Sequence, residues 1–405
     1  MDSTVRIVLA ARGVRAFGDG FVSLTLPLYL LTLGYSALQV GLVSTATLLG
    51  SALLSTIAGL CAARIGYRRA LRAAAVLMAA TGLAFSAVHD LWPVLVVAFV
   101  GTLNPSSGDV SVFLPLEHAV LSAAVTAERR TAAFARYSLA GAVCGAFGAL
   151  VASTPEIASD TLGLPTRAMF QALFVLYGVL GIVSWLLYRR LPTEHGAQER
   201  IQAAPLRDSR RIVVVLAALF SVDAFAGGLV VQSMLTLWLV QRFGLEPAQL
   251  GALFFATSLL AGASYLAAAP MARRVGLVNT MVFTHIPSSM ALIAVAFASD
   301  VRAAVVLLLV RSALSQMDVP TRSSYVMAVV TPAERPAAAS LTAVPRSLAA
   351  AASPLLSGYL LLLSAFGWPL VIAGAIKIAY DLTLLALFRN VRPPEEARSS
   401  GAAAR

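Results

Sequence analysis

Charged residues are scarce in this chain, and cysteine and lysine are scarcer still. Only 12% of its residues are charged while 59% are hydrophobic, whereas soluble globular domains average about 25% charged and about 45–50% apolar residues. This composition excludes an ordinary soluble domain. The two cysteines, Cys61 and Cys144, lie in apolar stretches without a histidine at metal-site spacing, which excludes a disulfide framework and a structural zinc site.

The formal charge of +11 is carried almost entirely by arginine, because Lys377 is the only lysine. A basic chain can bind nucleic acid, but this requires a basic face with aromatic platforms, and no segment here has one. The arginines instead form short clusters between apolar runs, as in the cytoplasmic loops of membrane proteins. We therefore expect no nucleic-acid partner.

Motifs of the common catalytic classes are also missing. Lys377 lies in Gly-Ala-Ile-Lys-Ile, which is not the phosphate-binding loop that an ATP-driven pump needs. The sequence contains no GxSxG, no HExxH and no nucleotide-binding glycine fingerprint. We expect no enzyme activity, no cofactor and no metal site.

What the chain has in abundance is long apolar runs. A bilayer core of about 30 Å needs about 20 helical residues, and twelve runs approach or exceed that length. The sequence therefore predicts an all-α membrane protein with twelve transmembrane helices. The predicted spans are residues 13–33, 38–62, 70–88, 92–118, 131–153, 167–189, 212–240, 247–271, 277–298, 301–328, 337–364 and 366–388.

The connections between the spans alternate in arginine content, which predicts the orientation. Connections after spans two, four, eight and ten are rich in arginine, whereas the opposite ones, such as His89-Asp90, are short and poor in it. Because positive loops stay in the cytoplasm, we expect a multi-pass protein of the plasma (inner) membrane with both termini cytoplasmic. The arginines are Arg64, Arg68, Arg69, Arg72, Arg129, Arg130, Arg273, Arg274 and Arg335.

An internal repeat divides the chain into two halves. The segment Gly-Tyr-Ser-Ala-Leu-Gln-Val-Gly from Gly34 returns as Gly-Leu-Glu-Pro-Ala-Gln-Leu-Gly from Gly244, and Arg64-Ile-Gly66 returns as Arg274-Val-Gly276. Such self-similarity is typical of a duplicated unit. We predict six-helix bundles over residues 1–190 and 212–390, a cytoplasmic linker over 191–211 and a cytoplasmic tail over 391–405.

The loop after span two has the pattern of a known family. It reads Gly59-Leu-Cys-Ala-Ala-Arg64-Ile-Gly66-Tyr-Arg68-Arg69, which is similar to the signature G-x-L-a-D-R-x-G-R-R of the major facilitator superfamily. The acidic residue of that signature is replaced by alanine, so the family's usual carboxylate contact is not expected here.

Over its whole length the chain resembles a transporter of this superfamily, closest in character to its proton-coupled drug and metabolite exporters. The resemblance implies two pseudo-symmetric six-helix bundles with the substrate site near the midplane between them. It also implies that spans one, four, seven and ten line the cavity. The glycines at 141, 145 and 148 partly match the fifth-span signature of exporters, although close helix packing explains such spacing equally well.

Ionisable residues within the spans are unfavourable by about 2.5–3.5 kcal/mol each on insertion scales, so they point to paired charges or to function. All of the following lie on the four spans that the resemblance makes cavity-lining: Asp19, Asp109, Glu117, Asp223, Arg311 and Asp318.

Three of these carboxylates, Asp223, Asp19 and Glu117, are candidates for proton coupling. Asp223 leads because it lies near the middle of span seven with no cationic residue three or four positions away. An unpaired carboxylate in a low dielectric binds a proton more readily. The alternative is an aspartate that is hydrogen-bonded to a serine or to the backbone.

The other ionisable residues form predicted pairs. Asp109 and Arg136 lie at similar depth on consecutive spans, and so do Asp318 and Arg346 in the second half. We expect two buried structural or gating ion pairs, with a direct role in substrate or proton handling as the alternative. Lys377 and Asp381 are four residues apart on one helix and are expected to pair with each other.

A break in span four suggests where substrate binds. Asn104-Pro-Ser-Ser-Gly-Asp109 interrupts an apolar run, and broken helices in transporters often line the binding site, although a simple proline kink is the alternative. Candidate substrate-cavity residues are Asn104, Ser106, Ser107, Gln232, Arg311 and Gln316.

Together these patterns predict a secondary active transporter that exports a small organic or amphiphilic compound in exchange for protons. Its expected partners are the lipid bilayer, the small-molecule substrate and protons, and we expect a monomer. If Arg311 binds substrate, the alternative is a symporter that takes up a small anionic metabolite. A membrane scaffold or sensor that does not transport is the remote alternative.

Overall fold

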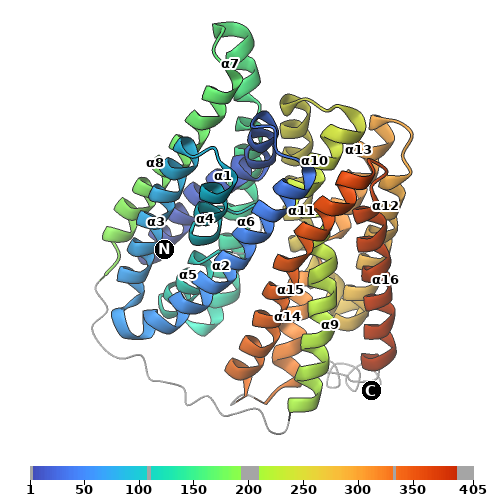
Figure 1. The fold of residues 1–405 in the computed structure, drawn as a ribbon. Coiled ribbons are helices and arrows are strands. Elements are labelled where there is room, and N and C mark those ends of the chain that lie inside the picture. Colours follow the sequence, from blue (N-terminus) through green and yellow to red (C-terminus); the bar gives the residue numbers. More distant parts are fainter. Residues whose placement is uncertain (1–2, 107–110, 193–208, 332–333, 390–405) are drawn as a thin grey trace. The chain divides into compact units, whose positions relative to one another are not determined.

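The computed structural model describes residues 3–106, 111–192, 209–331 and 334–389, and these residues form helices and short connections without any strand (Figure 1). The predicted all-α fold class is therefore confirmed. Predicted linker residues 193–208 and the predicted tail 391–405 lie outside the described residues. The helices are α1 (Ser3–Thr32), α2 (Ala37–Ile65), α3 (Tyr67–Ala87), α4 (Leu91–Val100), α5 (Phe113–Ala123), α6 (Ala127–Val151), α7 (Thr154–Leu162), α8 (Thr166–Arg189), α9 (Arg210–Leu229), α10 (Gln232–Phe243), α11 (Pro247–Val275), α12 (Leu277–Ala296), α13 (Val301–Leu314), α14 (Asp318–Val329), α15 (Arg335–Leu363) and α16 (Trp368–Phe388).

Ten helical segments of the described residues are long and apolar enough to cross a membrane, with α9 and α10 counted as one. The predicted spans 92–118 and 301–328 are not among them. The structure divides the first into α4 and α5 and the second into α13 and α14. Span 212–240 is also interrupted, between α9 and α10. The three interrupted spans are the fourth, seventh and tenth.

The repeated landmarks of the sequence have the same local structure in both copies. Gly66 and Gly276 each separate two helices with a φ of 88°, a conformation that favours glycine because it lacks a Cβ. Gln39 accepts a hydrogen bond from the backbone N–H of Ser36, and Gln249 accepts the equivalent bond from Glu246, at 2.8 and 3.1 Å. The repeat is thus structural as well as sequential.

The described residues divide into two compact units. Unit one comprises the described residues within 3–192, 230–259 and 351–366, and unit two comprises those within 209–229, 260–350 and 367–389. These units differ from the two predicted bundles, because α10, the first part of α11 and the end of α15 pack with the first half of the chain.

In unit one, α1 packs against α6 and α8, and α3 packs along α8. Glycines bring the backbones of α1 and α6 together. A Cβ at Gly148 would overlap the carbonyl oxygen of Phe17, and a Cβ at Gly20 would overlap that of Gly145. The glycine spacing on α6 therefore serves close packing against α1.

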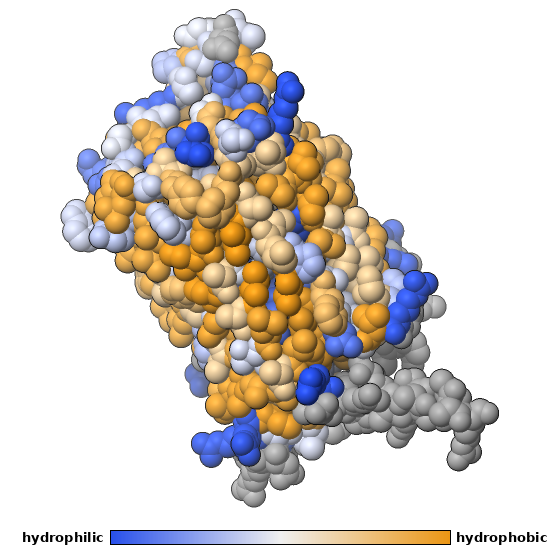
Figure 2. Space-filling view, turned by 90° about the vertical axis from the view of Figure 1, so that its right-hand side faces the viewer, coloured by the Kyte–Doolittle hydropathy of each residue, from blue (hydrophilic) through white to orange (hydrophobic). Residues whose placement is uncertain are grey.

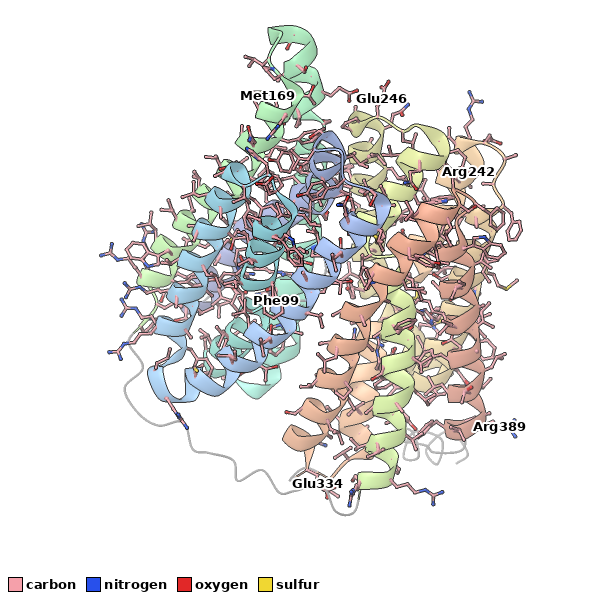
Figure 3. The ribbon with its side chains drawn as sticks, viewed as in Figure 1. Phe99, Met169, Arg242, Glu246, Glu334 and Arg389 are labelled. Atoms are coloured by element: carbon pink, nitrogen blue, oxygen red, sulfur yellow. The ribbon has the colours of Figure 1, made fainter. Side chains whose placement is uncertain are left out.

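In unit two, α16 packs on both α9 and α12, and α12 also contacts α13 and α14. Phe220, Tyr325, Tyr380 and Phe388 belong to its buried apolar core. At the end of unit two where Figure 3 shows both Glu334 and Arg389, the Glu334 carboxylate accepts the backbone N–H of Ser209 at 3.2 Å. This bond ties the start of α9 to the residue before α15.

The outer surface is apolar where lipid tails would cover it. Phe283 and Met290 on α12, Val306 on α13 and Leu382 on α16 are each more than half exposed. The face in Figure 2 is largely apolar, with its hydrophilic residues gathered towards the ends. Such extensive apolar exposure is unfavourable in water and fits a protein embedded in a bilayer.

Candidate functional site

A buried cluster of six ionisable side chains lies in unit two, with Asp223 of α9 near its centre. Lys377 Nζ on α16 donates to Asp223 Oδ1 at 2.6 Å, and Arg322 Nη1 on α14 donates to Asp223 Oδ2 at 2.9 Å. The side chain of Asp223 is only 7% exposed. Each carboxylate oxygen thus accepts a hydrogen bond from a basic side chain.

Arg322 connects Asp223 to a second carboxylate. Its Nη2 donates to Asp318 Oδ2 at 2.8 Å, one turn away on α14. The guanidinium also lies over the ring of Phe220, 5.3 Å from its centroid. Because a guanidinium has five N–H donors in a fixed plane, Arg322 can hold both carboxylates at once and stack on the ring.

His285 of α12 and Asp381 of α16 complete the cluster. His285 Nδ1 lies 3.0 Å from Asp381 Oδ2, and its Nε2 lies 3.4 Å from Lys377 Nζ. The same Nε2 lies 3.8 Å from Asp223 Oδ1. One imidazole therefore stands between two carboxylates and an ammonium group.

Groups of both charge signs are packed closely in this cluster. Its three carboxylates face a lysine and an arginine, and the sixth member is a histidine. Arg346, which lies within electrostatic reach of Arg322, Asp223 and Asp318, adds a further positive charge to the surroundings. An uncompensated charge is unfavourable at such burial, so a change in the number of bound protons would disturb the pairing.

The structure corrects three predictions about charge pairing: one carboxylate that was expected to lack a cationic partner, and two expected ion pairs. Asp223 is not without a cationic partner, because its partners lie on other helices. Lys377 and Asp381 do not pair with each other: Lys377 binds Asp223, and Asp381 binds His285.

Asp318 likewise pairs with Arg322 rather than with the predicted Arg346. Arg346 lies within electrostatic reach of Arg322, Asp223 and Asp318, but it has no ion pair among the residues that the structure describes. Its side chain is largely exposed. Asp318 and Arg322 are one helical turn apart on α14, so the guanidinium of Arg322 reaches the Asp318 carboxylate directly.

Arg322 and His285 were missed by the sequence analysis. The first could have been found, because Asp318 and Arg322 have the spacing of a helical ion pair. His285 gave no such signal: it lies in an apolar helix with no ionisable residue nearby in the sequence.

A second buried cluster, in unit one, surrounds Glu117 of α5. Arg15 of α1 forms an ion pair with its carboxylate, and the hydroxyls of Tyr137 and Tyr188 each donate to it at 2.6 Å. Arg15 also lies over the ring of Phe113, 4.1 Å from its centroid. This candidate carboxylate is therefore fully compensated.

Asp19 lies one turn along α1 from Arg15. It is 5% exposed and within electrostatic reach of both Arg15 and Tyr177. The first-half candidates, Asp19 and Glu117, thus share Arg15 as a cationic neighbour.

The break in span four contacts the start of α10 within unit one. The Pro105 carbonyl accepts the backbone N–H of Ser233 at 3.0 Å, and Ser233 Oγ lies 3.2 Å from Ser44 Oγ. Asn104 Oδ1 accepts both the backbone N–H and the hydroxyl of Ser106, at 3.1 and 2.7 Å.

The other candidates in unit one are scattered. Gln232 is the first residue of α10, beside this contact. Arg136 is exposed on α6. Ser107 and Asp109 lie outside the described residues, so the predicted pair of Asp109 with Arg136 stays a prediction.

Two candidates lie near the break between α13 and α14: Arg311 is in the last turn of α13, and Gln316 is in the break itself. Arg311 is half-buried, and its guanidinium has no hydrogen bond or ion pair among the described part of the chain. Gln316 accepts the hydroxyl of Tyr265 on α11 at 2.9 Å. Of these two, Arg311 has unused donors for a ligand.

One arginine of the loop signature after α2 donates a hydrogen bond to the backbone of another helix. Arg68 Nη2 donates to the carbonyl of Arg189 at 2.6 Å, which links the start of α3 to the end of α8. Arg64 and Arg69 are exposed, and Gly59 has open space where a Cβ would stand.

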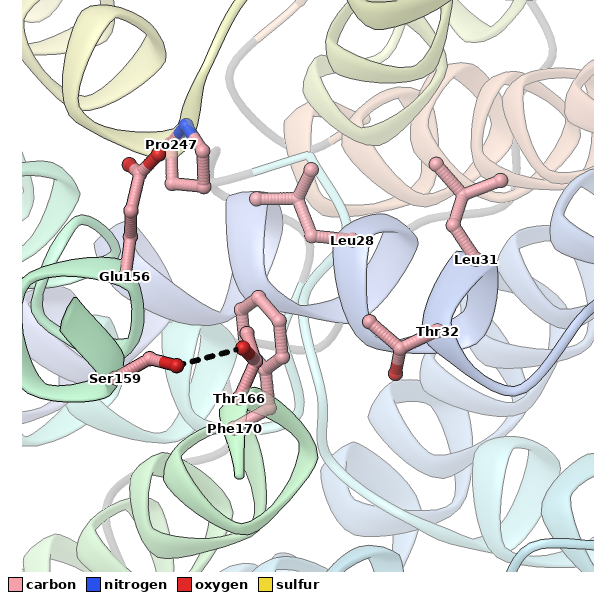
Figure 4. A pocket seen from close by; sticks show the side chains of 8 residues that line it. All are labelled: Leu28, Leu31, Thr32, Glu156, Ser159, Thr166, Phe170 and Pro247. Atoms are coloured by element: carbon pink, nitrogen blue, oxygen red, sulfur yellow. Dashed lines mark hydrogen bonds between the residues drawn. The ribbon is translucent and has the colours of Figure 1, made fainter. Parts of the chain in front are cut away.

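A pocket of about 370 Å³ lies in unit one, away from every predicted site residue (Figure 4). Figure 4 shows Leu28, Leu31 and Thr32 of α1 on one side, and Glu156 of α7 beside Pro247 on the other. Ser159, Thr166 and Phe170 also line the pocket, and a hydrogen bond of 3.1 Å joins the hydroxyls of Ser159 and Thr166. Within the described ranges, no group of three or more His, Cys, Asp or Glu side chains is placed to hold a metal ion.

Comparison with known proteins agrees with the fold. The family model described as Major Facilitator Superfamily matches residues 8–314 and 216–405. The uncharacterized membrane protein YJR124C of Saccharomyces cerevisiae is 22% identical over 422 residues, which cover 96% of this chain and 94% of the yeast protein.

Two solved structures have similar folds at low sequence identity. A mutant of the nucleoside transporter NupG matches with a TM-score of 0.74 and 13% identity, covering 96% of this chain and 100% of that chain. The xylose transporter XylE from E. coli, in a partially occluded inward-open conformation, matches with a TM-score of 0.74 and 12% identity, covering 97% and 99%. The present chain therefore belongs to the Major Facilitator Superfamily and is a multi-pass membrane transporter.

Proposed function

We propose that this transporter is proton-coupled and exports a small organic or amphiphilic compound by alternating access, from the cytoplasm across the plasma (inner) membrane. The observation that carries the proposal is the buried cluster around Asp223. It contains three carboxylates, a lysine, an arginine and one histidine. A buried cluster with a histidine among carboxylates and cations can couple proton movement to a conformational change.

The substrate class is inferred from the residue types of the cavity candidates. The described cavity candidates Asn104, Ser106, Gln232 and Gln316 are uncharged, and they suit a neutral or cationic compound with a few polar groups. Export is the direction that the resemblance to proton-coupled exporters implies. The three glycines of α6 belong to that resemblance, although they also pack α6 against α1.

Purified transporter in lipid vesicles with an imposed pH gradient tests the proposal. A fluorescent pH indicator reports proton movement while the cation ethidium, the neutral amphiphile chloramphenicol and the anion lactate are added in turn. We expect ethidium or chloramphenicol to dissipate the gradient. The Asp223→Asn variant should lower that rate at least about tenfold, because it removes the carboxylate that holds Lys377 and Arg322 together.

Asp90→Asn is the matched control, since it makes the same chemical change at an exposed residue outside the cluster. Its rate should stay within about twofold of the unmodified protein, as for most exposed substitutions. Proton movement that survives Asp223→Asn would exclude this cluster from coupling. Unchanged gradients with all three compounds would favour another coupling ion, uniport or the non-transporting scaffold.

Uptake of an anionic metabolite is a second candidate function, favoured by Arg311. Its half-buried guanidinium lacks a partner among the described residues, and a guanidinium binds carboxylate in bidentate geometry. In the same vesicles, lactate alone would then move protons. Arg311→Ala should abolish that response, whereas Arg311→Lys should only weaken it, because lysine keeps the charge but loses the planar fork.

A further inference from the structure

One side chain of the Asp223 cluster is placed to respond to a proton. Asp223 faces Lys377 and Arg322, and Asp318 faces Arg322. Asp381 is fully buried and accepts hydrogen bonds from His285, and the structure gives it no other hydrogen-bond donor among the residues it describes. His285 is the member that contacts both a carboxylate and an ammonium group, and an imidazole nitrogen can act as either donor or acceptor.

The hydrogen bonds of His285 define its state. Nδ1 faces a carboxylate at 3.0 Å and Nε2 faces an ammonium group at 3.4 Å. A carboxylate only accepts and an ammonium only donates. The arrangement therefore corresponds to a neutral ring that carries its proton on Nδ1 and accepts from Lys377 at Nε2.

A second proton changes the partners of this ring. The proton, taken from solvent, would bind the Nε2 lone pair, and the new N–H could no longer accept from Lys377. The two groups would then be like charges a short distance apart. The nearest carboxylate to the protonated Nε2 is Asp223, whose Oδ1 lies 3.8 Å away.

Asp223 Oδ1 is also the atom that Lys377 binds, at 2.6 Å. Protonated His285 and Lys377 would therefore compete for the same carboxylate oxygen. Because Lys377 is on α16, Asp223 on α9 and His285 on α12, this competition acts directly on the packing of three helices.

We infer that His285 is the residue of this cluster that binds and releases the proton, and that its protonation displaces Lys377 from the imidazole and re-partners Asp223. The inference deepens the proposed function and rests on it for the link to transport. It makes His285 the proton-binding group and Asp223 the residue that positions its partners.

The charged and titratable groups around the ring come from α9 and from α13, α14 and α16, the helices that pack on α12. They are Asp223 on α9, Arg322 with Asp318 on α14, and Lys377, Tyr380 and Asp381 on α16. α13 adds Arg311, whose carbonyl accepts the hydroxyl of Ser288 at 3.2 Å. Tyr380 meets the imidazole edge to face, 6.2 Å between ring centroids.

Nitrogen-15 NMR of the full-length transporter in nanodiscs tests the inference without a substrate. The chain has four histidines, so replacing His89, His118 and His195 by glutamine leaves His285 as the only labelled imidazole. The two ring nitrogens have different shifts in each tautomer and in the imidazolium. We expect the Nδ1–H form at the alkaline end of a pH series and the imidazolium at its acidic end.

Variants of the neighbours separate this switch from an ordinary buried histidine. Asp381→Asn should lower the ratio of imidazolium to neutral imidazole at a fixed pH by about tenfold, because it removes a negative partner. Lys377→Met should raise that ratio by about tenfold, because it removes the competing cation. Lys377→Arg keeps the charge and should stay near the unmodified value.

Three results would overturn the inference: an Nε2–H tautomer, an imidazole that stays in one form from about pH 5 to 8, and a titration unaffected by Lys377→Met. The vesicle assay tests the proposed function separately. If His285 titrates as expected while no compound moves protons, the proposed coupling fails and the proton-binding residue stands. If protons move but His285 does not titrate, the coupling stands and this assignment fails.

Discussion

At the scale of single residues, each of the two buried clusters contains an arginine that lies over a phenylalanine ring, but the helices that carry the two side chains differ. In unit one the cation is Arg15 on α1 and the ring beneath it is Phe113 on α5. In unit two the cation is Arg322 on α14 and the ring is Phe220 on α9. The charge and the ring have exchanged helices between the two halves of the repeat.

The two clusters also differ in charge balance. Glu117 has one cation and two tyrosine hydroxyls, which satisfy it without a further proton. The Asp223 cluster contains an odd number of carboxylates and one histidine. We therefore interpret the first as a structural pair and the second as the titrating site.

A structural role for Glu117 predicts a large loss of stability when its charge is removed. Glu117→Gln leaves the guanidinium of Arg15 buried without a counter-charge, which should lower the free energy of unfolding by about 3–5 kcal/mol. Unfolding of the purified protein by SDS in mixed micelles measures this change. Glu246→Gln, at an exposed carboxylate, should change it by less than about 0.5 kcal/mol.

Replacing both charges gives the complementary result. The double variant Arg15→Met, Glu117→Gln removes the unpaired cation, so it should recover part of the stability that the single variant loses. An effect equal to the sum of the two single variants would contradict a direct pair, since coupled residues are not additive.

At the scale of helices, some interruptions could be predicted from the sequence and others could not. Pro105 removes a backbone donor and glycine follows soon after, so the break between α4 and α5 was expected. Gly227 and Gly228 precede the break between α9 and α10, where the Ser233 N–H instead bonds to Pro105. Ser315-Gln316-Met317 contains neither proline nor glycine, and its break was not predicted.

Close packing of α6 on α1 predicts that added volume at the contact is harmful. Gly148→Ala would place a methyl group against the carbonyl of Phe17, and overpacking of this kind typically lowers stability by about 1–3 kcal/mol. The apparent melting temperature of the purified protein in detergent reports this as a decrease.

Gly59→Ala is the matched control, because its Cβ would meet open space within α2. Alanine is the better helix former by up to about 1 kcal/mol, so this variant should melt at the same temperature or higher. Equal melting of both variants would exclude close packing as the reason for the glycines of α6.

At the scale of the whole molecule, periodicity and repetition predicted the fold, while the site depended on distant contacts. Apolar runs and the repeated Gly66 and Gly276 were enough to predict an all-helical duplicated membrane protein, whereas the prediction of a transporter depended on the resemblance of the loop after span two to a known family. The pairing of Asp223 with Lys377 was not predictable from helical spacing, because its two residues are 154 positions apart. Local spacing even suggested the wrong partner for Lys377, since Asp381 is closer in the sequence.

The alternation of arginine-rich and arginine-poor connections predicts the orientation of the molecule. α3 has 21 residues, about 31 Å at 1.5 Å per residue, and therefore can cross the hydrocarbon core once. Arg69 at its start and Asp90 just after its end are both exposed. Positive loops stay inside, so Arg69 should be cytoplasmic and Asp90 external.

Cysteine labelling in cells tests this orientation directly. In a background where Cys61 and Cys144 are replaced by serine, Asp90→Cys should react with a membrane-impermeant maleimide in intact cells, and Arg69→Cys only after permeabilisation. The reverse pattern would place both termini outside the cell, and the arginine-rich connections would then be external rather than cytoplasmic. Labelling of both cysteines in intact cells would show that α3 does not span the membrane, because a single crossing must put its two ends on opposite sides.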